Sequence, residues 1–454
     1  MNMNIVLIGA GSAQFGLGTL GDVFQSEILK NSHITLVDIN QKALDVVYQK
    51  GVNFLAKNSL PFTISQTTER TKALLDADVV IISIEVGDRF ALWNDDWSIP
   101  QQYGVSQVYG ENGGVGGIFH ALRITPVILA ICEDVARLCP QAWVFNYSNP
   151  MTAITTAVLR RYPEMKFIGL CHEVLSHERY LPTILETPFD NLFLRSGGLN
   201  HFSVLLEARY KDTNMDAYGD ILKKAPPFFE KEIGFSDMLE YVLRTGKVPH
   251  TEGSTGRTLI DHPYSAKPWA DRTLFKTLLE TYQLLPITSD SHLGEYISWA
   301  SDVTDHKGIK DFYTIYQMML AQEKPEIELH RDERLILIME GIVTNSGYEE
   351  PAVNVMNKGL IPSLPSDIAV EVPARVYRTH MDAIAFPHYP KGFSSLLTNY
   401  YGTYDLTAQA ILEEKKHLVL QAVLANPVVH SIYHAKEMVE FMISRQLQYL
   451  SYLK

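Results

Sequence analysis

The first 24 residues place a glycine-rich turn between a strand and a helix, and no other stretch constrains the fold as strongly. Residues 4–8 form a short apolar run, Gly9-Ala10-Gly11-Ser12 follows, and residues 13–24 are typical of a helix. The first glycine permits a tight turn, and the second lets the backbone approach a pyrophosphate at the helix N-terminus. The pattern therefore predicts a nucleotide-binding α/β unit.

A second apolar run, residues 33–38, ends in Asp38. An acidic residue there accepts hydrogen bonds from both ribose hydroxyls and disfavours a 2′-phosphate, so the pattern favours NAD over NADP. The third glycine of the usual fingerprint would fall at position 14, which is Gln14, although Gly16 and Gly18 follow. A glycine turn in an unrelated α/β protein is the alternative interpretation.

Strands and helices alternate through the first half of the chain, and residues 125–139 have helical spacing. Three further apolar runs indicate buried parallel strands, at residues 77–84, 142–150 and 165–171. From about residue 196 the pattern becomes mixed. We predict an α/β fold, with a Rossmann-like, doubly wound parallel sheet over residues 1–195 and an α+β C-terminal domain over residues 196–454.

Composition narrows the class of protein. The net charge of −13 disfavours nucleic acid or an anionic membrane as a partner. No run of about 18 apolar residues is found, and the N-terminus lacks the features of a signal peptide, so we expect a cytoplasmic protein without a transmembrane helix. Three cysteines form no disulfide framework. Cys132 and Cys139 are expected in the core, whereas Cys171 can act as a thiolate.

Cys171 ends the run 165–171, at the strand end where doubly wound sheets place ligands. The segment CHEV, which begins there, has three polar counterparts: NYSNPM (146–151), GGLNHFS (197–203) and ITSDSHLGEY (287–296). Together they offer a thiolate, imidazoles, carboxylates and amides, which suits zinc or another divalent metal with open positions for substrate oxygens. Each segment alone also has a structural interpretation, with His201 as a hydrogen-bonded structural histidine and Cys171 as an inert buried thiol.

The glycine turn with Ser12, Asp38, NYSNPM, CHEV, GLNHF and finally VNVMNKGLIPSLPSDIAVEVPA (353–374) follow one another along the chain. This order of motifs resembles glycoside hydrolase family 4 from about residue 3 to about residue 430. The resemblance implies a fold like that of lactate and malate dehydrogenases. It also implies a glycosidase that needs NAD, a divalent metal (usually Mn²⁺) and reducing conditions. A homodimer or homotetramer is expected by the same resemblance.

The resemblance implies roles for individual residues as well. Cys171 and His201 match the metal ligands, and Asn149 matches the asparagine that contacts the sugar. The residues implied at the cofactor site are Gly9, Gly11, Ser12, Phe15, Asp38 and Asn146. The other expected substrate contacts are Glu173, Asn200 and Arg89.

The residues that follow the cysteine vary with substrate in this family. The Cys-His-Glu version formed by Cys171, His172 and Glu173 looks most like the α-galacturonidase branch, which acts on non-phosphorylated uronic acids. His172 is expected near the leaving group, and Glu173 is expected to read the substrate. A uronate carboxylate suits a bidentate arginine. The candidates are Arg89, Arg123 and Arg375.

In the mechanism that the resemblance implies, NAD takes hydride from C3 of the sugar and a base removes the acidified proton on C2. The C1 substituent then leaves by metal-assisted elimination, after which water adds and the steps reverse. The tyrosine that is the base in the family's phospho-β-glucosidases is absent, so Asp290 and His292 are the candidates at the matching place. A helix N-cap is the alternative for Asp290, and Trp93 and Trp97 are expected in the core.

Alternatives remain open at this point. Within the family, the chain could be an α-glucosidase, an α-galactosidase or an α-glucuronidase. Outside it, an NAD-dependent 2-hydroxy-acid dehydrogenase would share the first domain but would need no metal. A non-catalytic, NAD-sensing binding protein is the third possibility.

Overall fold

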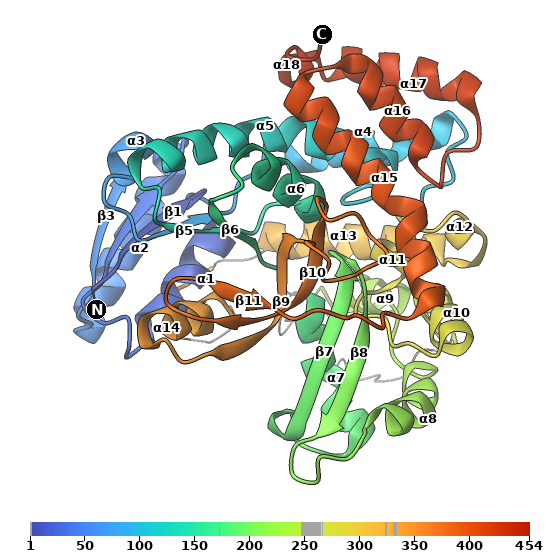
Figure 1. Cartoon of the computed structure of the whole chain (residues 1–454), viewed down its shortest axis with the longest axis horizontal. Coiled ribbons are helices and arrows are strands. Elements are labelled where there is room, and N and C mark those ends of the chain that lie inside the picture. The colour runs from blue at the N-terminus through green and yellow to red at the C-terminus, as the bar shows by residue number, and fades with distance from the viewer. Residues whose placement is uncertain (1, 172, 247–264, 266, 323–324, 330–333) are drawn as a thin grey trace.

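The computed structural model describes residues 2–171, 173–246, 265, 267–322, 325–329 and 334–454. One sheet runs through these residues, with strands in the order β3-β2-β1-β4-β5-β6-β9-β10-β7-β8 and β11 beside β10 (Figure 1). The first six strands in this order come from the first half of the chain. A single sheet therefore carries both halves of the protein.

The first six strands of the sheet are all parallel. They are β1 (Asn4–Ile8), β2 (His33–Val37), β3 (Thr63–Thr67), β4 (Val79–Ile82), β5 (Trp143–Asn146) and β6 (Lys166–Gly169). Their order, 3-2-1-4-5-6, is that of a doubly wound nucleotide-binding sheet. The predicted Rossmann-like fold is confirmed.

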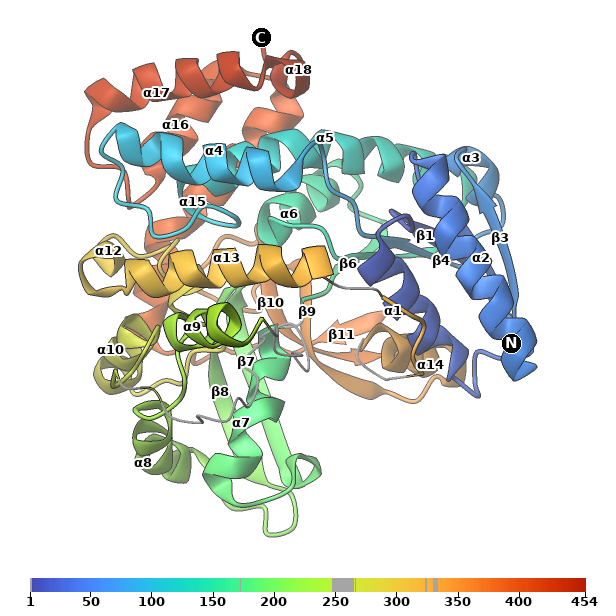
Figure 2. The same ribbon diagram turned by 180° about the vertical axis from the view of Figure 1, so that it is seen from behind.

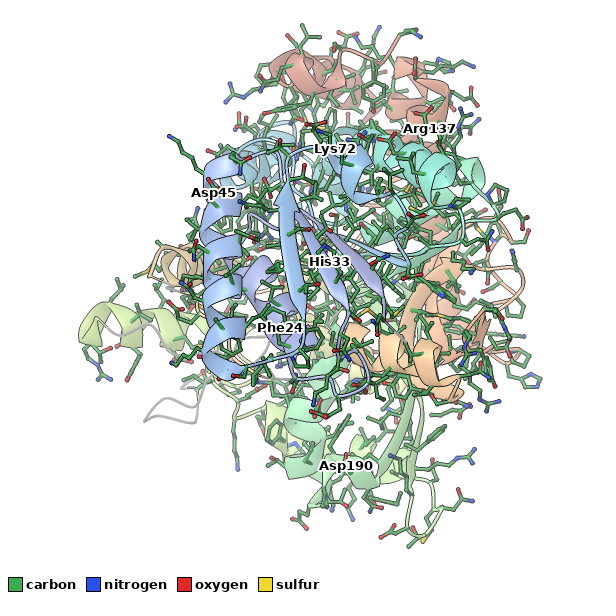
Figure 3. All side chains as sticks on the ribbon, turned by 90° about the vertical axis from the view of Figure 1, so that its left-hand side faces the viewer. Phe24, His33, Asp45, Lys72, Arg137 and Asp190 are labelled. Atoms are coloured by element: carbon green, nitrogen blue, oxygen red, sulfur yellow. The ribbon has the colours of Figure 1, made fainter. Side chains whose placement is uncertain are left out.

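Helices cover both faces of the parallel strands, as the alternation of side chains along β1 shows. Ile5 and Leu7 face the core beneath α1 and α2, whereas Val6 and Ile8 face the core beneath α5 and α6. Figure 3 looks onto this end of the molecule, with His33 on β2. The helices of this half are α1 (Ala13–Phe24), α2 (Gln41–Asn58), α3 (Arg70–Ala73), α4 (Arg89–Gln102), α5 (Gly114–Leu138) and α6 (Met151–Arg161).

The remaining strands continue the sheet in antiparallel fashion, beginning where Gly169 of β6 pairs with Asn354 of β9. They are β7 (Leu192–Leu199), β8 (Phe202–Tyr210), β9 (Tyr348–Met356), β10 (Ala369–Val376) and β11 (Met381–Ala383). The predicted division between residues 195 and 196 falls inside β7, so the sheet is continuous across it. The boundary stays a prediction.

Short and long helices surround the antiparallel strands (Figure 2). They are η1 (Glu173–Leu175), α7 (Ser176–Leu185), η2 (Phe189–Asn191), α8 (Tyr218–Phe229), α9 (Phe235–Thr245), α10 (Thr273–Tyr282), α11 (Asp290–Leu293), α12 (Ala300–Val303), α13 (His306–Gln322) and α14 (Leu335–Thr344). α14 lies against β9 and β10, on the same face as α1. This half is α+β, as predicted.

Helix α5 is 25 residues long and apolar enough, by length and composition, to cross a membrane. The search for apolar runs in the sequence missed this helix, and the expectation of no transmembrane helix stays a prediction. However, 78% of its most apolar window is buried inside the protein, as in the core helix of a globular domain. Cys132 lies on its buried face and Cys139 follows its last turn, and both thiols are in the core as predicted.

Four C-terminal helices cover α4 and α5 (Figures 1 and 2). They are α15 (Lys391–Glu413), α16 (Lys416–Ala425), α17 (Ile432–Arg445) and α18 (Leu447–Leu450). The contact is secured by Arg123 of α5, whose Nη2 lies 2.6 Å from Oδ2 of Asp96 and whose Nη1 donates to Gln446 at 2.7 Å. Arg123 is therefore a buried structural arginine, which corrects its candidacy as a reader of a substrate carboxylate.

Candidate active site

Two glycines shape the turn between β1 and α1. The φ angle of Gly9 is +92°, and a Cβ atom there would lie 1.9 Å from the carbonyl oxygen of Ser83. A Cβ atom on Gly11 would lie 2.7 Å from Oδ2 of Asp38. Neither position accepts a side chain, so this turn requires glycine to pack against the ends of β4 and β2. The turn leads into the N-terminus of α1, where a phosphate group can bind.

Asp38 closes this turn from the end of β2. Its Oδ2 accepts a hydrogen bond from the N–H of Gly11 at 2.8 Å, and its Oδ1 accepts one from Asn40 at 2.8 Å. Ser12 caps α1, with its Oγ accepting from the N–H of Phe15 at 3.4 Å. Residues 9–12 and Asp38 are called the nucleotide turn below. The structure brings together the predicted cofactor residues of this region: Gly9, Gly11, Ser12, Phe15 and Asp38.

The missing third glycine of the fingerprint has a structural counterpart at Gly16. A Cβ atom on Gly16 would lie 2.3 Å from the carbonyl oxygen of Ala10. The first turn of α1 therefore lies directly against the nucleotide turn, which is the close approach that the third glycine normally allows. Gln14 does not interrupt the motif, because the spacing has moved by two residues.

Asn146 was expected at the cofactor site, but its side chain shapes the turn after β5. It is fully buried, its Nδ2 donates to the carbonyl of Ser148 at 2.8 Å, and its Oδ1 accepts from the N–H of Ser148 at 3.3 Å. The amide of Asn146 is thus used within the turn, and its contact with the cofactor stays a prediction. Asn149, three residues later, is half-buried, and its Oδ1 accepts from the N–H of Met151 at 3.2 Å.

Cys171 and His201 come together although they belong to different strands. Sγ of Cys171 lies 3.0 Å from Nε2 of His201. Cys171 follows the end of β6, and His201 occupies the turn between β7 and β8, with a φ of +60°. The two predicted metal ligands are thus in direct contact at the carboxyl edge of the parallel strands, where such sheets bind ligands.

This pair fits a metal with open coordination positions. Burial, then the carboxylates of Glu371 and Glu173, hold the pKa of the Cys171 thiol well above its usual value. A divalent cation would reverse this effect, because it favours the thiolate. Within the described residues, no group of three or more His, Cys, Asp or Glu side chains is placed to hold a metal ion. Two protein ligands leave room for substrate oxygens.

His292 lies beside this pair, and its ring centroid is 4.4 Å from that of His201. Nδ1 of His292 is 3.6 Å from Oε2 of Glu295, and Nε2 is 3.9 Å from Oε1 of Glu173. Burial alone would lower its pKa, but Glu295, Glu173 and Glu111 raise it to about 9. We call Cys171, His201 and His292 the cysteine–histidine corner. His172, the other predicted histidine, lies outside the described residues.

Asp290 does not face this corner as an acid–base residue. Its Oδ2 and Oδ1 accept hydrogen bonds from the N–H groups of Leu274 and Phe275, each at 2.8 Å. The carboxyl is completely buried, and burial raises its pKa to about 7. Asp290 therefore caps α10, a neighbouring helix, and not the helix that begins at Asp290 itself, as the capping alternative expected. Both carboxyl oxygens are occupied in this way, which corrects the prediction of Asp290 as the base.

Glu295 is a residue of the site that the sequence did not reveal. Its Oε1 accepts hydrogen bonds from the N–H groups of Glu111 and Asn112, at 2.6 and 3.1 Å, while its Oε2 faces His292. It is completely buried. Glu295 thus connects the glycine-rich loop before α5 to His292. The available signal was its position three residues after His292, on the same face of a helical turn.

Asn200 was expected to contact substrate, but it is buried and bound within the protein. Its Nδ2 donates to Oε2 of Glu371 at 2.7 Å, and its backbone N–H donates to Oγ1 of Thr152 at 3.3 Å. A substrate contact by Asn200 stays a prediction. Glu371, which belongs to the motif at residues 353–374, was not predicted as a site residue.

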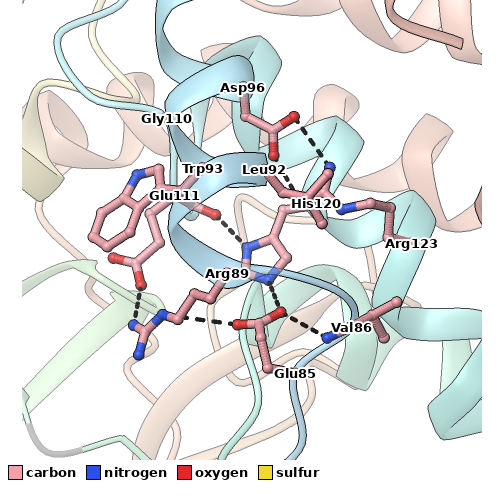
Figure 4. A pocket seen from close by; sticks show the side chains of 10 residues that line it. All are labelled: Glu85, Val86, Arg89, Leu92, Trp93, Asp96, Gly110, Glu111, His120 and Arg123. Atoms are coloured by element: carbon pink, nitrogen blue, oxygen red, sulfur yellow. Dashed lines mark hydrogen bonds and ion pairs between the residues drawn. The ribbon is translucent and has the colours of Figure 1, made fainter. Parts of the chain in front are cut away.

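Arg89 lies in a small pocket beside α4 (Figure 4). Its Nη2 is 3.2 Å from Oε1 of Glu111, and its Nε is 3.8 Å from Oε2 of Glu85. The pKa of Glu85 lies at about 2 despite its burial, because of His120 and Arg89. Arg89 is therefore already matched by two carboxylates. Trp93 lies under it at 5.6 Å and is buried, as expected for a core residue.

A second pocket, with about 560 Å³ of empty volume, opens beside the cysteine–histidine corner. Glu173 and His292 line it, as do Arg272 and Glu232, which are joined at 2.9 Å. Its apolar walls are the rings of Tyr180, Phe235 and Phe312. Aromatic rings beside polar and charged side chains suit a sugar, whose faces are apolar and whose edges are polar.

Comparison with solved structures defines the class of fold. A 6-phospho-α-glucosidase from gut microorganisms, solved with NAD and Mn²⁺, has a TM-score of 0.78 at 18% identity and covers 99% of each chain. A malate dehydrogenase from Plasmodium falciparum, solved with NADH, has a TM-score of 0.51 at 14% identity, covering 92% of this chain and 100% of its own. The fold is that of the malate dehydrogenase-like, NAD-binding enzymes, as predicted.

The chain belongs to family 4 of the glycosyl hydrolases. Residues 4–187 match the model described as "Family 4 glycosyl hydrolase", and residues 196–429 match that of the "Family 4 glycosyl hydrolase C-terminal domain". An α-glucosidase from Erwinia rhapontici is 57% identical over 454 residues, which is the full length of both chains. The protein is thus a glycosidase of an NAD- and divalent-metal-dependent family, and the dehydrogenase and non-catalytic alternatives are set aside.

Proposed function

We propose that this protein hydrolyses neutral α-linked glucosides. The structural observation that carries the proposal is the charge around the cysteine–histidine corner, where His292 is surrounded by Glu173, Glu295 and Glu111. Arg89, the candidate for binding an anionic substrate, is paired with Glu111 and Glu85. A uronate or a sugar phosphate would add negative charge to a site already rich in carboxylates.

We do not propose the α-galacturonidase specificity that the Cys-His-Glu motif suggested. Glu173 lies 3.9 Å from His292 and would repel a substrate carboxylate. Arg375, another candidate for reading a carboxylate, lies 3.5 Å from Glu349 and is half exposed. The similarity to an α-glucosidase over the whole chain supports the same choice.

The nucleotide turn and the cysteine–histidine corner have different roles in the proposed reaction, since the first would bind NAD and the second a divalent metal. NAD would supply a reversible hydride acceptor, and a divalent metal such as Mn²⁺ would supply a Lewis acid for the sugar oxygens. Gly9, Gly11 and Asp38 would hold the nucleotide, and Cys171 and His201 would hold the metal. Asn149 stays the proposed sugar contact near the end of β5.

His292 is the described residue best placed to move a proton. Glu295 faces its Nδ1 at 3.6 Å, which orients the ring and leaves Nε2 directed toward Glu173 and the second pocket. A histidine oriented by a buried carboxylate is a common acid–base group, and its raised pKa of about 9 means that His292 is protonated at neutral pH and is placed to donate a proton first. Glu173 is placed to accept a hydrogen bond from a sugar hydroxyl, and the second pocket is placed to hold the leaving group.

The test is release of 4-nitrophenol from the 4-nitrophenyl α-glucoside, with NAD, Mn²⁺ and a thiol present and then with each omitted. We expect a kcat/KM at least about tenfold higher than for the α-galacturonide, dependence on NAD and metal, and no net NADH. Faster release from the α-galacturonide would reject the neutral-substrate proposal.

A matched pair of variants tests the role of Glu173. Glu173→Gln should lower kcat/KM for the α-glucoside. It should also reduce the ratio of kcat/KM between the α-glucoside and the α-galacturonide, because the charge that repels a substrate carboxylate is lost. Glu178→Gln, at an exposed position of α7, is the control and should change neither value. An unchanged ratio of kcat/KM between the two substrates in Glu173→Gln would show that this carboxylate does not select the substrate.

The cytoplasmic location and the homo-oligomeric state are also part of the proposal. A cysteine ligand such as Cys171 needs a reducing compartment to stay a thiolate. Exposed apolar side chains on α17, Ile432 and Tyr433, would be covered in an oligomer. Light scattering of the purified wild type and of Tyr433→Glu measures the oligomeric state. A monomeric wild type would contradict the proposed homo-oligomer.

A further inference from the structure

The distance between Cys171 and His201 depends on strands that carry neither residue. Cys171 follows β6, and His201 lies between β7 and β8, while β9 and β10 separate β6 from β7 in the sheet (Figure 1). The 3.0 Å contact between the two side chains therefore requires that four strands keep their register. Something in the intervening strands has to hold the two ligand segments together.

Glu371, on β10, contacts the segment of His201 on both sides. Its Oε2 accepts a hydrogen bond from Nδ2 of Asn200 at 2.7 Å, and its Oε1 accepts one from Oγ of Ser203 at 2.8 Å. These two partners flank His201 in the turn between β7 and β8, and all three side chains are buried. In the ladder, Glu371 is also paired with Gly198 of β7.

The same carboxylate reaches the segment of Cys171 through Asn354 on β9. Nδ2 of Asn354 donates to Oε2 of Glu371 at 3.2 Å and lies 3.5 Å from the carbonyl oxygen of Gly169. Gly169 is the last residue of β6, and a Cβ atom on it would lie 2.9 Å from that of Asn354. β6 and β9 are therefore in close contact just before Cys171.

We propose that Glu371 is the positioning residue of the metal site, which aligns the Cys171 and His201 segments by accepting hydrogen bonds from Asn200, Ser203 and Asn354. The inference rests on the proposed metal site. Partners of this kind commonly tune metal affinity although they do not touch the ion. Without Glu371, three buried donors lose their acceptor, and the turn that carries His201 loses its anchor.

The decisive experiment is calorimetric titration of Mn²⁺ into the full-length protein with NAD present, in wild type, Glu371→Ala and Glu371→Gln. We expect the alanine variant to bind Mn²⁺ about ten- to a hundredfold more weakly. The glutamine variant should stay within about threefold, because its amide oxygen can accept from Asn200 and Asn354 while its amide N–H donates to Ser203. NAD affinity, measured separately, should be unchanged in both.

A spectroscopic readout separates positioning from a general structural role. With Co²⁺ in place of Mn²⁺, the thiolate-to-cobalt absorption band reports whether Cys171 is bound to the metal. The band should weaken in Glu371→Ala and persist in Glu371→Gln. Glu350→Gln is the matched control, since Glu350 is an equally buried carboxylate of the same sheet but is bonded to Arg334 at 2.8 Å. It should change stability without changing Mn²⁺ affinity.

The inference is overturned if Glu371→Ala keeps wild-type Mn²⁺ affinity or if its NAD affinity falls as much as its Mn²⁺ affinity. It is also overturned if Glu371→Gln loses as much Mn²⁺ affinity as Glu371→Ala. Should the alanine variant fail to fold, Asn354→Ala replaces it, because it removes only the link to β6; unchanged Mn²⁺ affinity there also overturns the inference. Failure of the metal site itself looks different, since wild type and Cys171→Ser would then bind Mn²⁺ equally or not at all.

Discussion

The nucleotide turn and the cysteine–histidine corner lie at the same edge of one sheet but are built by different means. The nucleotide turn is made mainly within residues 9–38, by a backbone N–H group and glycines that leave no space for a side chain against Asp38 and Ser83. The corner is made by side chains from β6, the β7–β8 turn and α11, held by buried carboxylates. The first site is a property of a local backbone, whereas the second is a property of strand order.

The largest effect is expected at the cysteine–histidine corner. Cys171→Ser should reduce kcat/KM for the α-glucoside by about a thousandfold or more, because the soft thiolate ligand is lost. NAD affinity should be kept, since the nucleotide turn is untouched. Fluorescence titration of NAD and the nitrophenol assay measure both quantities. Cys139→Ser, in the core, is the control. Equal loss of NAD affinity would break the division between the two sites.

The nucleotide turn should respond to a single methyl group. Gly9→Ala should destabilise the protein by about 3 kcal/mol or more and abolish NAD binding, because of its positive φ and the clash with Ser83. Gly18→Ala, on α1, is the matched control: its Cβ meets nothing within 4 Å, so it should stabilise the protein by up to about 1 kcal/mol. Urea unfolding measures both. A well-tolerated Gly9→Ala would contradict a backbone-defined site.

A smaller effect is expected at Asp38, whose side chain accepts a hydrogen bond from the N–H of Gly11 in the nucleotide turn. Asp38→Asn should weaken NAD binding about tenfold and reduce discrimination against NADP, because the negative charge near the ribose is lost. Asp45→Asn, on the exposed side of α2, is a suitable control. Competition binding with NAD and NADP gives the ratio. An unchanged ratio of NAD to NADP affinity would mean that Asp38 only accepts the hydrogen bond of Gly11 and does not contact the ribose.

The smallest effect on activity is expected for a substitution of Asp290. This substitution tests whether the Asp290 carboxyl takes part in the chemistry of the cysteine–histidine corner. Asp290→Asn should keep kcat within about threefold, since Asp290 caps α10. A base at this position would instead lose several orders of magnitude.

The stability of the same variant should depend on pH. Burial raises the pKa of Asp290 from 3.8 to about 7, so its contribution to stability is complete below about pH 4 and is lost as the pH rises through about 7. The difference corresponds to about 4 kcal/mol. Asparagine mimics the protonated acid, so the Tm of Asp290→Asn relative to wild type should rise from pH 5 to pH 8. A constant difference would contradict the raised pKa.

Much of the corner could be anticipated from motifs, but the roles within it could not. Cys171 and His201 were expected as a pair and are in contact at 3.0 Å. Asn146 and Asn200 stand in equally suggestive motifs, yet their amides are bonded inside the protein. A motif places a residue near a site but does not say which way its side chain turns, because that depends on neighbours from distant segments.

The sequence by itself determined the doubly wound sheet, the nucleotide turn and the family of this protein. These features follow from hydrophobic periodicity, glycine geometry and short motifs, which involve neighbouring residues. Only the tertiary structure decided that Asp290 caps a helix, that Glu295 orients His292 and that Glu371 joins the two ligand segments. The physical reason is that a buried carboxyl takes its role from the donors that surround it, and these donors come from distant segments that only the tertiary fold brings together.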